Sequence, residues 1–370
     1  MTKYAEGFWK IAALSALACC SAAVSSQACS SFRVTAKDGT VIAARSMEFG
    51  YDVNYGLVAM PRGHEFTSPA PDSKTGLKWK NKYGFSGVSV FGQDELLSDG
   101  MNEAGLAASG LWYETDTRWP SVFSRDSSKA LAHTMFISWA LGNFSTVAEV
   151  KAGLVKVKPF GLYVPQMKMV PPMHFSLTDA TGASIVVEAD NGEVHVYDNP
   201  LGIMTNAPAF PWMITNLRTY IGLRNTMVAP LRAEGVPLPP TGHGNGMIGL
   251  PGDLTPPSRF VRIATTLYFA TPAADANSAL HLALHVLNSV DIVLGMAVDK
   301  NAAGEVVSSE STQWVSLRDL TNRVMYLRTY DGSNLKMVDL KKIDFSDGKV
   351  KKGSLYADKE VITDITSAIR

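Results

Sequence analysis

The sequence has little cysteine and no excess of charge of either sign. Its 370 residues contain three cysteines, and the 34 basic and 34 acidic side chains give a formal net charge of +0. No basic surplus is present to neutralise phosphates, so nucleic acid is not expected as a partner. The sequence also lacks an apolar run of about 18 or more residues, which argues against a membrane-spanning segment of the mature protein. Internal repeats and low-complexity blocks are absent as well, which is typical of a well-packed globular chain.

Several catalytic signatures are missing too. There is no G-x-S-x-G motif for a serine hydrolase. The glycine-rich segment 242–246 lacks the preceding strand and the lysine of a phosphate-binding loop. His281 and His285 have a spacing that can bind a metal, but they share one polar stripe with Ser278 and Asn288, which favours a solvated helix face. We therefore predict no metal and no cofactor.

The first 28 residues have the order of an export signal. Lys3 and Lys10 come first, residues 11–24 form a short apolar run, and Ser26 and Ala28 are the small side chains that a signal peptidase requires. This pattern predicts a signal peptide over residues 1–28, cleavage after Ala28, and a periplasmic or secreted mature protein without membrane attachment. A buried first helix and a lipoprotein that uses Cys20 are the two alternatives.

Removal of this signal would leave one cysteine, Cys29, at the first position of the mature chain. Exported proteins usually keep their cysteines in disulfide pairs, so a solitary thiol suggests that its chemistry is used. An N-terminal cysteine combines a thiol nucleophile with an α-amino group that can accept the thiol proton. Such an amidase also needs a cation near the sulfur, an acceptor for the ammonium group, and donors that face the oxyanion.

Strand and helix patterns occur in blocks along the chain, which predicts one α+β domain over residues 29–370 with largely antiparallel sheets. A hairpin is expected over 29–49, because turn residues 36–39 separate two strand-like runs. Residues 61–82 and 230–258 are expected to be irregular. Helices are expected to begin near Thr146, Ser258 and Ala274. The remaining expected strands are 85–91, a meander over 173–205, 313–316, 323–329 and 335–339.

Five ordered motifs resemble one known family over nearly the whole mature chain. They are C-S-S-F at 29–32, R-S-M-E at 45–48, G-M-N-E-A-G-L at 100–106, T-N-A-P-A-F at 205–210, and L-P-G-D-L-x-x-x-S-R-F-V-R at 250–262. Together they resemble the choloylglycine hydrolase and penicillin V acylase family, whose members are N-terminal nucleophile hydrolases. The resemblance implies a four-layer αββα sandwich, a small-molecule N-acyl substrate and a homo-oligomer, by family tendency a tetramer.

The resemblance also implies roles for single residues. Cys29 would attack the amide carbonyl with Arg45 beside its sulfur. Glu48 would hold the α-amino group, and Arg259 would add positive charge and fix the geometry. The side chain of Asn206 and the backbone N–H of Trp112 would form the oxyanion hole. The side chains of Trp112 and Phe49 would line the acyl pocket.

One residue departs from the family pattern. The family usually has aspartate where this chain has Glu48, and the extra methylene moves the carboxylate by about 1.5 Å. This difference leaves open a non-catalytic binding protein on the same fold. The main prediction is an exported amidase that cleaves linear amide C–N bonds. The export signal and the aromatic pocket residues are more similar to the Gram-negative penicillin V acylase branch, with N-acyl homoserine lactones as further candidate substrates and conjugated bile salts as the alternative.

Overall fold

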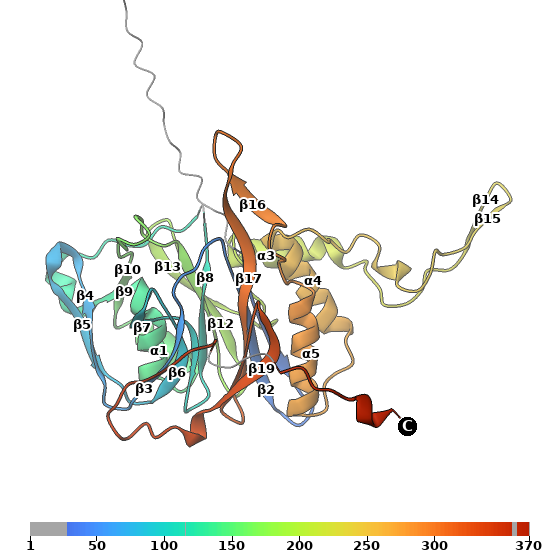
Figure 1. Cartoon of the computed structure of the whole chain (residues 1–370). Coiled ribbons are helices and arrows are strands. Elements are labelled where there is room, and N and C mark those ends of the chain that lie inside the picture. The colour runs from blue at the N-terminus through green and yellow to red at the C-terminus, as the bar shows by residue number, and fades with distance from the viewer. Residues whose placement is uncertain (1–27, 115, 357–360, 370) are drawn as a thin grey trace, which may run out of the picture.

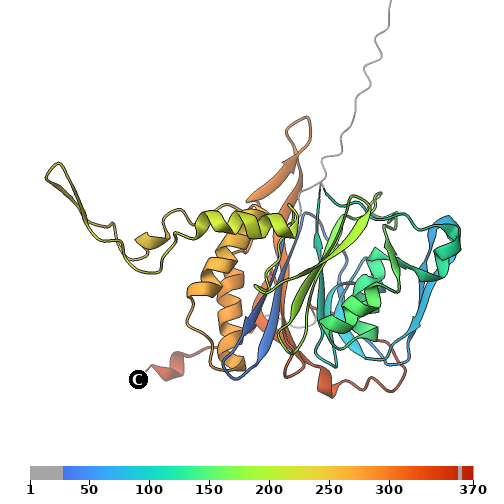
Figure 2. The same cartoon turned by 180° about the vertical axis from the view of Figure 1, so that it is seen from behind.

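The computed structural model describes residues 28–114, 116–356 and 361–369. Of the predicted signal peptide, residues 1–28, residues 1–27 lie outside them. Two antiparallel sheets stack face to face, and helices cover the outer face of each, as Figures 1 and 2 show. This is the four-layer αββα arrangement that the family resemblance implied, with α4 and α5 on one side and α1 on the other. No helix among the described residues is long and apolar enough to cross a membrane.

The first sheet has six strands and carries the start of the described chain. Its order is β1-β2-β17-β18-β19, with β16 also paired to β17. Its strands are β1 (Cys29–Thr35), β2 (Val41–Phe49), β16 (Ala297–Lys300), β17 (Val306–Asp319), β18 (Val324–Thr329) and β19 (Gly332–Asp339).

The second sheet has eight strands in the order β13-β12-β11-β8-β7-β6-β3-β20. Its strands are β3 (Gly56–Met60), β6 (Phe85–Val90), β7 (Gln93–Asn102), β8 (Ala107–Trp112), β11 (Met173–Thr178), β12 (Ser184–Asp190), β13 (Glu193–Asp198) and β20 (Lys351–Gly353). Three small two-stranded pairs join β4 (Glu65–Pro69) to β5 (Thr75–Lys80), β9 (Ala130–Ala132) to β10 (Lys158–Phe160), and β14 (Leu231–Ala233) to β15 (Val236–Leu238).

The α-helices are α1 (Phe136–Asn143), α2 (Val147–Leu154), α3 (Phe210–Leu217), α4 (Pro256–Phe269) and α5 (Ala276–Asn288). One apolar core fills the space between the sheets and under α4 and α5, and a second lies between the eight-stranded sheet and α1 and α2. Every residue of β2 is buried, because α5 covers one face of this central strand and the other sheet covers the opposite face. Residues that alternate along β2 therefore face two different environments.

Several boundaries differ from the sequence prediction. Residues 61–82, expected to be a loop, contain the β4–β5 hairpin, whose Phe66 and Trp79 rings stack at 4.8 Å. Helix α4 begins at Pro256, with Thr255 as its N-cap, and not at Ser258. Two prolines occupy its first turn, where a missing N–H costs nothing. Residues 202–205 form no strand of the meander and make only one bridge, from Met204 to Ser31. The helix after Thr146 is present, and the Thr146 side chain accepts from the N–H of Glu149.

Candidate active site

Cys29 is the first residue of β1 and lies opposite Met47 of β2. The turn between the two strands closes at Gly39, whose φ of +87° favours glycine. The thiol is free and its residue is 2% exposed. In this chain Ala28 is still joined to Cys29, so the Cys29 nitrogen is an amide N–H. It donates to Oδ1 of Asn206 at 2.8 Å.

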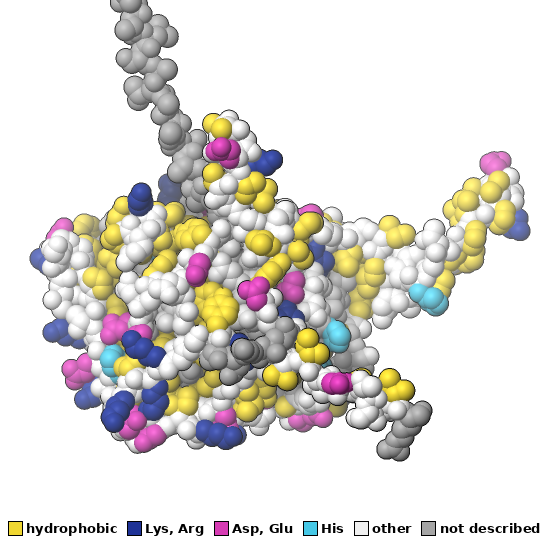
Figure 3. All heavy atoms as spheres, viewed as in Figure 1, with side chains coloured by type: hydrophobic (Ala, Val, Ile, Leu, Met, Phe, Trp, Pro, Cys, Tyr) yellow, Lys and Arg dark blue, Asp and Glu magenta, His cyan; other side chains and the backbone are white. Residues whose placement is uncertain are grey.

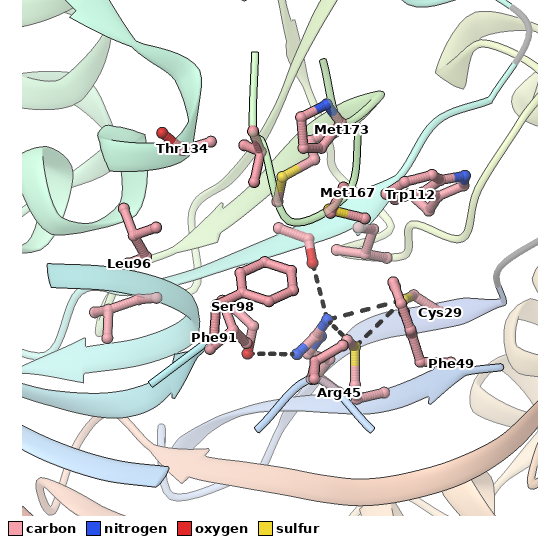
Figure 4. A pocket seen from close by; sticks show the side chains of 18 residues that line it. Cys29, Arg45, Phe49, Phe91, Leu96, Ser98, Trp112, Thr134, Met167 and Met173 are labelled. Atoms are coloured by element: carbon pink, nitrogen blue, oxygen red, sulfur yellow. Dashed lines mark hydrogen bonds between the residues drawn. The ribbon is translucent and has the colours of Figure 1, made fainter. Parts of the chain in front are cut away.

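Arg45 lies beside the sulfur, as Figure 4 shows, with its Nη2 3.8 Å from Sγ of Cys29. The same nitrogen donates to the Gly110 carbonyl oxygen at 2.9 Å, and Nη1 forms an ion pair with Asp99 at 2.7 Å. Both side chains are 1% exposed or less, and a buried charge pair of this kind is held in place by its hydrogen bonds. The guanidinium is therefore fixed next to the thiol.

Asp99 was not identified from the sequence. It ends the segment just before the G-M-N-E-A-G-L motif, and its Oδ1 also accepts from Ser316 at 3.2 Å. That motif has a structural role: Gly105 has a φ of +88°, and a Cβ there would lie 2.5 Å from the Leu320 carbonyl oxygen. The motif thus turns β7 into β8, and this turn sets the position of Asp99 relative to Arg45. Its place directly before a family motif is the one sequence signal that could have indicated it.

Glu48 faces away from Arg45, because residues three apart on a strand lie on opposite faces. Its Oε1 accepts from the Thr312 hydroxyl at 2.9 Å, and its Oε2 makes no hydrogen bond of ordinary geometry within the described chain. Burial raises the pKa of Glu48 to about 7, and the charge of Arg259 opposes that rise. A β-bulge at Gln313 lets Thr312 pair with Glu48 while Trp314 pairs with Met47.

Asn206 and Arg259 bind each other and the nucleophile segment. Nη2 of Arg259 donates to Oδ1 of Asn206 at 2.6 Å, and Nη1 donates to the Cys29 carbonyl oxygen at 2.6 Å and to Ser30 Oγ at 2.7 Å. Nδ2 of Asn206 donates to the carbonyl oxygen of Trp112 at 2.8 Å. One of its two N–H groups is thereby used, and the second remains as a further donor. Arg259 lies in the first turn of α4 and is fully buried.

A second buried pair holds the segment that carries Asn206. His174 of β11 contacts Glu188 of β12 at 2.9 Å through Nδ1 and the carbonyl oxygen of Thr205 at 2.9 Å through Nε2. Glu188 also accepts from the backbone N–H of Phe210. These contacts bind both ends of the segment 205–210. Neither residue was predicted as a site residue, because the meander alone does not show which strand residues face this loop.

Trp112 and Phe49 are among the residues that line a cavity. Their rings meet edge to face at 6.0 Å, and Phe49 makes a similar contact with Tyr51 at 4.8 Å. The cavity lies beside Cys29, and about 650 Å³ of unfilled space, open solvent included, lies among its lining residues. Figure 4 shows Leu96, Met167 and Met173 around it. The polar side chains among its lining are Cys29, Arg45, Ser98 and Thr134.

Charges around the thiol act in opposite directions. Burial raises the pKa of Cys29, and the charge of Arg45 and a hydrogen bond from the Trp112 backbone lower it. The charge of Glu48 raises it further. The arrangement places a cation and the Trp112 backbone N–H beside one buried thiol, and groups of this kind can support acyl transfer. The described residues contain no group of three or more His, Cys, Asp or Glu that could hold a metal ion, and His281 and His285 are exposed on α5.

The structure brings Cys29, Arg45, Glu48, Asn206 and Arg259 into one cluster of contacts, with Trp112 and Phe49 at the adjoining cavity. Comparisons with known proteins identify a family for the chain. The sequence profile described as "Linear amide C-N hydrolases, choloylglycine hydrolase family" matches residues 29–353. The match begins at Cys29.

The chain is similar in sequence or in fold to the following proteins. A bile salt hydrolase/transferase from Clostridium perfringens is 29% identical over 328 residues, covering 87% of this chain and 95% of that protein. The solved conjugated bile acid hydrolase from the same organism has a TM-score of 0.79 at 28% identity and covers 91% of this chain and 99% of its own. The penicillin V acylase from Agrobacterium tumefaciens has a TM-score of 0.68 at 27% identity and covers 87% of this chain and 90% of its own.

Proposed function

The chain belongs to the choloylglycine hydrolase family of linear amide C–N hydrolases, and from that premise we propose that it is an exported amidase similar to penicillin V acylases. It cleaves N-acyl compounds whose acyl group is apolar, with phenoxyacetyl amides first and N-acyl homoserine lactones second. The observation that carries this proposal is the cavity beside Cys29. Its walls are almost entirely apolar, and the Phe49 and Trp112 rings in its lining suit a flat ring or an alkyl chain.

The proposed reaction begins when Cys29 Sγ attacks the amide carbonyl carbon and the thiol proton passes to the α-amino group. The oxyanion accepts hydrogen bonds from Asn206 Nδ2 and the Trp112 N–H. The C–N bond then breaks, and the leaving amine takes the proton back from the α-ammonium. Water hydrolyses the remaining thioester, releases the acid and restores the thiol.

Cleavage after Ala28 is required in this scheme, because an amide nitrogen cannot accept the thiol proton. The cut turns the Cys29 nitrogen into an amine that already lies 2.8 Å from Asn206 Oδ1. The free Oε2 of Glu48 is then available to the new ammonium group. The longer glutamate side chain fits this role because the Thr312 hydroxyl holds its other oxygen.

Processing is tested by the intact mass of the exported protein, which should start at Cys29. Cys29→Ser should be exported and cut in the same way and lose nearly all turnover, since a hydroxyl ionises far less than a thiol. A start at any other residue would remove the α-amino base from the mechanism. A protein that starts at Cys29, reacts with iodoacetamide and hydrolyses no amide would indicate the binding protein instead.

Substrate class is tested by measuring kcat/KM for penicillin V, a long-chain acyl homoserine lactone and a glycine-conjugated bile salt. We expect penicillin V to be the best substrate. Trp112→Ala should raise KM for penicillin V most, because lost ring contacts contribute about 0.5–1.5 kcal/mol beyond area burial. Trp212→Ala, which removes a half-exposed indole from α3, is the control. If the bile salt is the best substrate, the alternative function holds and the cysteine mechanism remains.

A further inference from the structure

Arg318 is a buried arginine to which the proposed mechanism gives no role. It lies on β17, is 1% exposed, and reaches from the first sheet to the second. We propose that Arg318 is a positioning residue for the nucleophile: it acts through Asp99 to keep one nitrogen of Arg45, and a surplus of positive charge, at the Cys29 thiol. This inference rests on the proposed function only through the role of that thiol as the nucleophile.

Arg45 binds Asp99 through one nitrogen. Its Nη1 donates to Oδ2 of Asp99 at 2.7 Å, whereas its Nη2 lies 3.8 Å from Sγ of Cys29. Arginine and carboxylate groups frequently pair through two parallel hydrogen bonds, and a pair that includes Nη1 needs Nη2 as its second donor. Such a pair would draw Nη2 away from the sulfur. Arg45 therefore serves the thiol as long as the second oxygen of Asp99 is held elsewhere.

Two residues of β17 hold that second oxygen. Oδ1 of Asp99 accepts from the Ser316 hydroxyl at 3.2 Å and forms an ion pair with Nη1 of Arg318 at 3.8 Å. Ser316 and Arg318 are two positions apart on the strand, so their side chains share the face that packs on the second sheet. Together they keep Oδ1 away from Arg45, which leaves the pair of Arg45 and Asp99 with a single hydrogen bond.

The side chain of Arg318 is itself fixed by acceptors in both sheets. Its Nη1 donates to Oγ of Ser109 at 2.8 Å and to the Ala108 carbonyl oxygen at 3.3 Å, both on β8. Its Nε donates to the Ala43 carbonyl oxygen on β2 at 3.3 Å. Burial lowers the pKa of Arg318 to about 10, so the group is still a cation near neutral pH.

Two buried guanidinium groups thus share one carboxylate. The cluster of Arg45, Asp99 and Arg318 carries one net positive charge, and each of the three side chains is 1% exposed or less. A buried charge without a partner is costly, so this surplus stabilises a negative charge that forms beside it. The Cys29 thiolate is such a charge. Loss of Arg318 should therefore disfavour the thiolate in two ways, by removing the surplus charge and by freeing Oδ1 to take Nη2 of Arg45.

The test measures how the alkylation of Cys29 by iodoacetamide depends on pH in the processed protein, because the thiolate is the form that reacts. Arg318→Met removes the charge and keeps an unbranched side chain. Its alkylation pKa should rise by about one unit, and its rate constant at pH 7 should fall by at least about threefold, since a higher pKa also makes the thiolate somewhat more nucleophilic. Arg318→Lys keeps a cation for Oδ1 of Asp99 and should return the pKa to near the wild-type value.

Differences between these variants report on Arg318, because the other charged groups near the thiol are the same in all of them. Those groups are Glu48 on β2, Arg259 on α4, Glu310 on β17 and the α-amino group. Arg323→Met is the matched control. It removes a half-buried arginine from the turn after β17, whose guanidinium donates to the carbonyl oxygens of Glu103 and Thr321, and it should leave the pKa unchanged.

Ser316→Ala is a smaller change that frees the same oxygen of Asp99 from its other partner. It should raise the alkylation pKa in the same direction but by less than Arg318→Met. If Arg318→Met does not fold, Ser316→Ala decides alone.

An unchanged alkylation pKa in Arg318→Met and Ser316→Ala would overturn the inference. An equal rise in Arg318→Met and Arg318→Lys would overturn it as well, because packing and not charge would then be responsible. Alkylation needs no amide substrate, so the two proposals fail separately. Proteins that show these shifts but hydrolyse no amide would overturn the proposed function and leave the inference standing.

Discussion

At the scale of single residues, the thiol of Cys29 is influenced by charges on the two faces of β2. Arg45 and Met47 project toward the eight-stranded sheet, where Asp99 holds the guanidinium. Glu48 projects the other way, toward Thr312 and the charge of Arg259. The strand period of two produces this separation. Cys29, the first residue of the neighbouring strand β1, is therefore influenced by charges on both faces of β2.

Asn206→Ala should lower kcat by on the order of 10²–10³, because the variant loses the side-chain donor to the oxyanion. Asn206→Asp keeps an oxygen for Arg259 and for the Cys29 nitrogen but removes Nδ2, so it should lose as much activity. Steady-state kinetics on penicillin V separates kcat from KM. An effect restricted to KM would mean that Asn206 contacts only the ground-state substrate.

Glu48 should make the uncleaved chain less stable as pH rises. Its folded pKa of about 7 lies above its ordinary value of 4.5, so between these values the folded chain binds more protons than the unfolded chain. The free energy of unfolding therefore falls as pH rises through this window and levels off above it. Relative to Glu48→Gln, which resembles the neutral form, the wild type should lose roughly 1–3 kcal/mol between pH 4.5 and 8.

Urea unfolding of both chains with Ala28 retained measures this effect. Glu310 has a similarly raised pKa and remains in both, so its contribution cancels in the comparison. If the free energy of unfolding changes with pH in the same way in both chains, Glu48 stays ionised in the folded chain and the prediction is wrong. After cleavage the new ammonium group should favour the charged carboxylate, and the difference should shrink.

At the scale of elements, the site lies where the start of β1, at Cys29, comes close to the end of β8, at Trp112. The segment before Asn206 runs beside β1, where Ser31 and Met204 exchange two backbone hydrogen bonds of 2.7 and 2.8 Å. The pair of His174 and Glu188 then fixes the bend that follows. The position of Asn206 is therefore set by β1 of the first sheet together with β11 and β12 of the second.

Glu188→Gln should lower kcat while leaving the thiol reactive. The variant weakens the contacts to His174 and Phe210, so Asn206 should be held less firmly and the oxyanion hole should be impaired. We expect a fall of about 10-fold or more in kcat. The rate of Cys29 alkylation by iodoacetamide should change little, since Arg45 is untouched. A parallel fall in both rates would indicate general loss of the fold.

At the scale of the whole molecule, residues 222–255 form an arm that leaves the sandwich between α3 and α4, as Figures 1 and 3 show. The arm includes the β14–β15 hairpin, and its large apolar side chains are exposed. They are Met227, Val228, Leu231, Val236, Leu238 and Ile248. Apolar surface of this kind is typical of an interaction site. We propose that the arm binds a second copy of the chain in a homo-oligomer.

Light scattering on the purified enzyme should give the mass of several chains, with a tetramer expected. Leu231 and Leu238 are paired across the hairpin, so replacing both with aspartate should lower that mass while the cavity remains intact. Glu234→Gln at the hairpin turn is the control and should assemble like the wild type. A wild type that behaves as a single chain would contradict the proposal.

The sequence alone determined the nucleophile candidate, the N-terminal hairpin, the α+β class and most of the strands, because turn residues, the strand period and ordered motifs are local signals. It could not place the β4–β5 hairpin, whose polar, proline- and glycine-rich residues resemble a loop until Phe66 and Trp79 stack. Only the tertiary structure decided that Asp99 holds Arg45, that His174 and Glu188 hold the Asn206 segment, and that Glu310 faces Ala28. These partners are 54, 31 and 282 positions apart or lie on different strands, so only the packing of the two sheets brings them together.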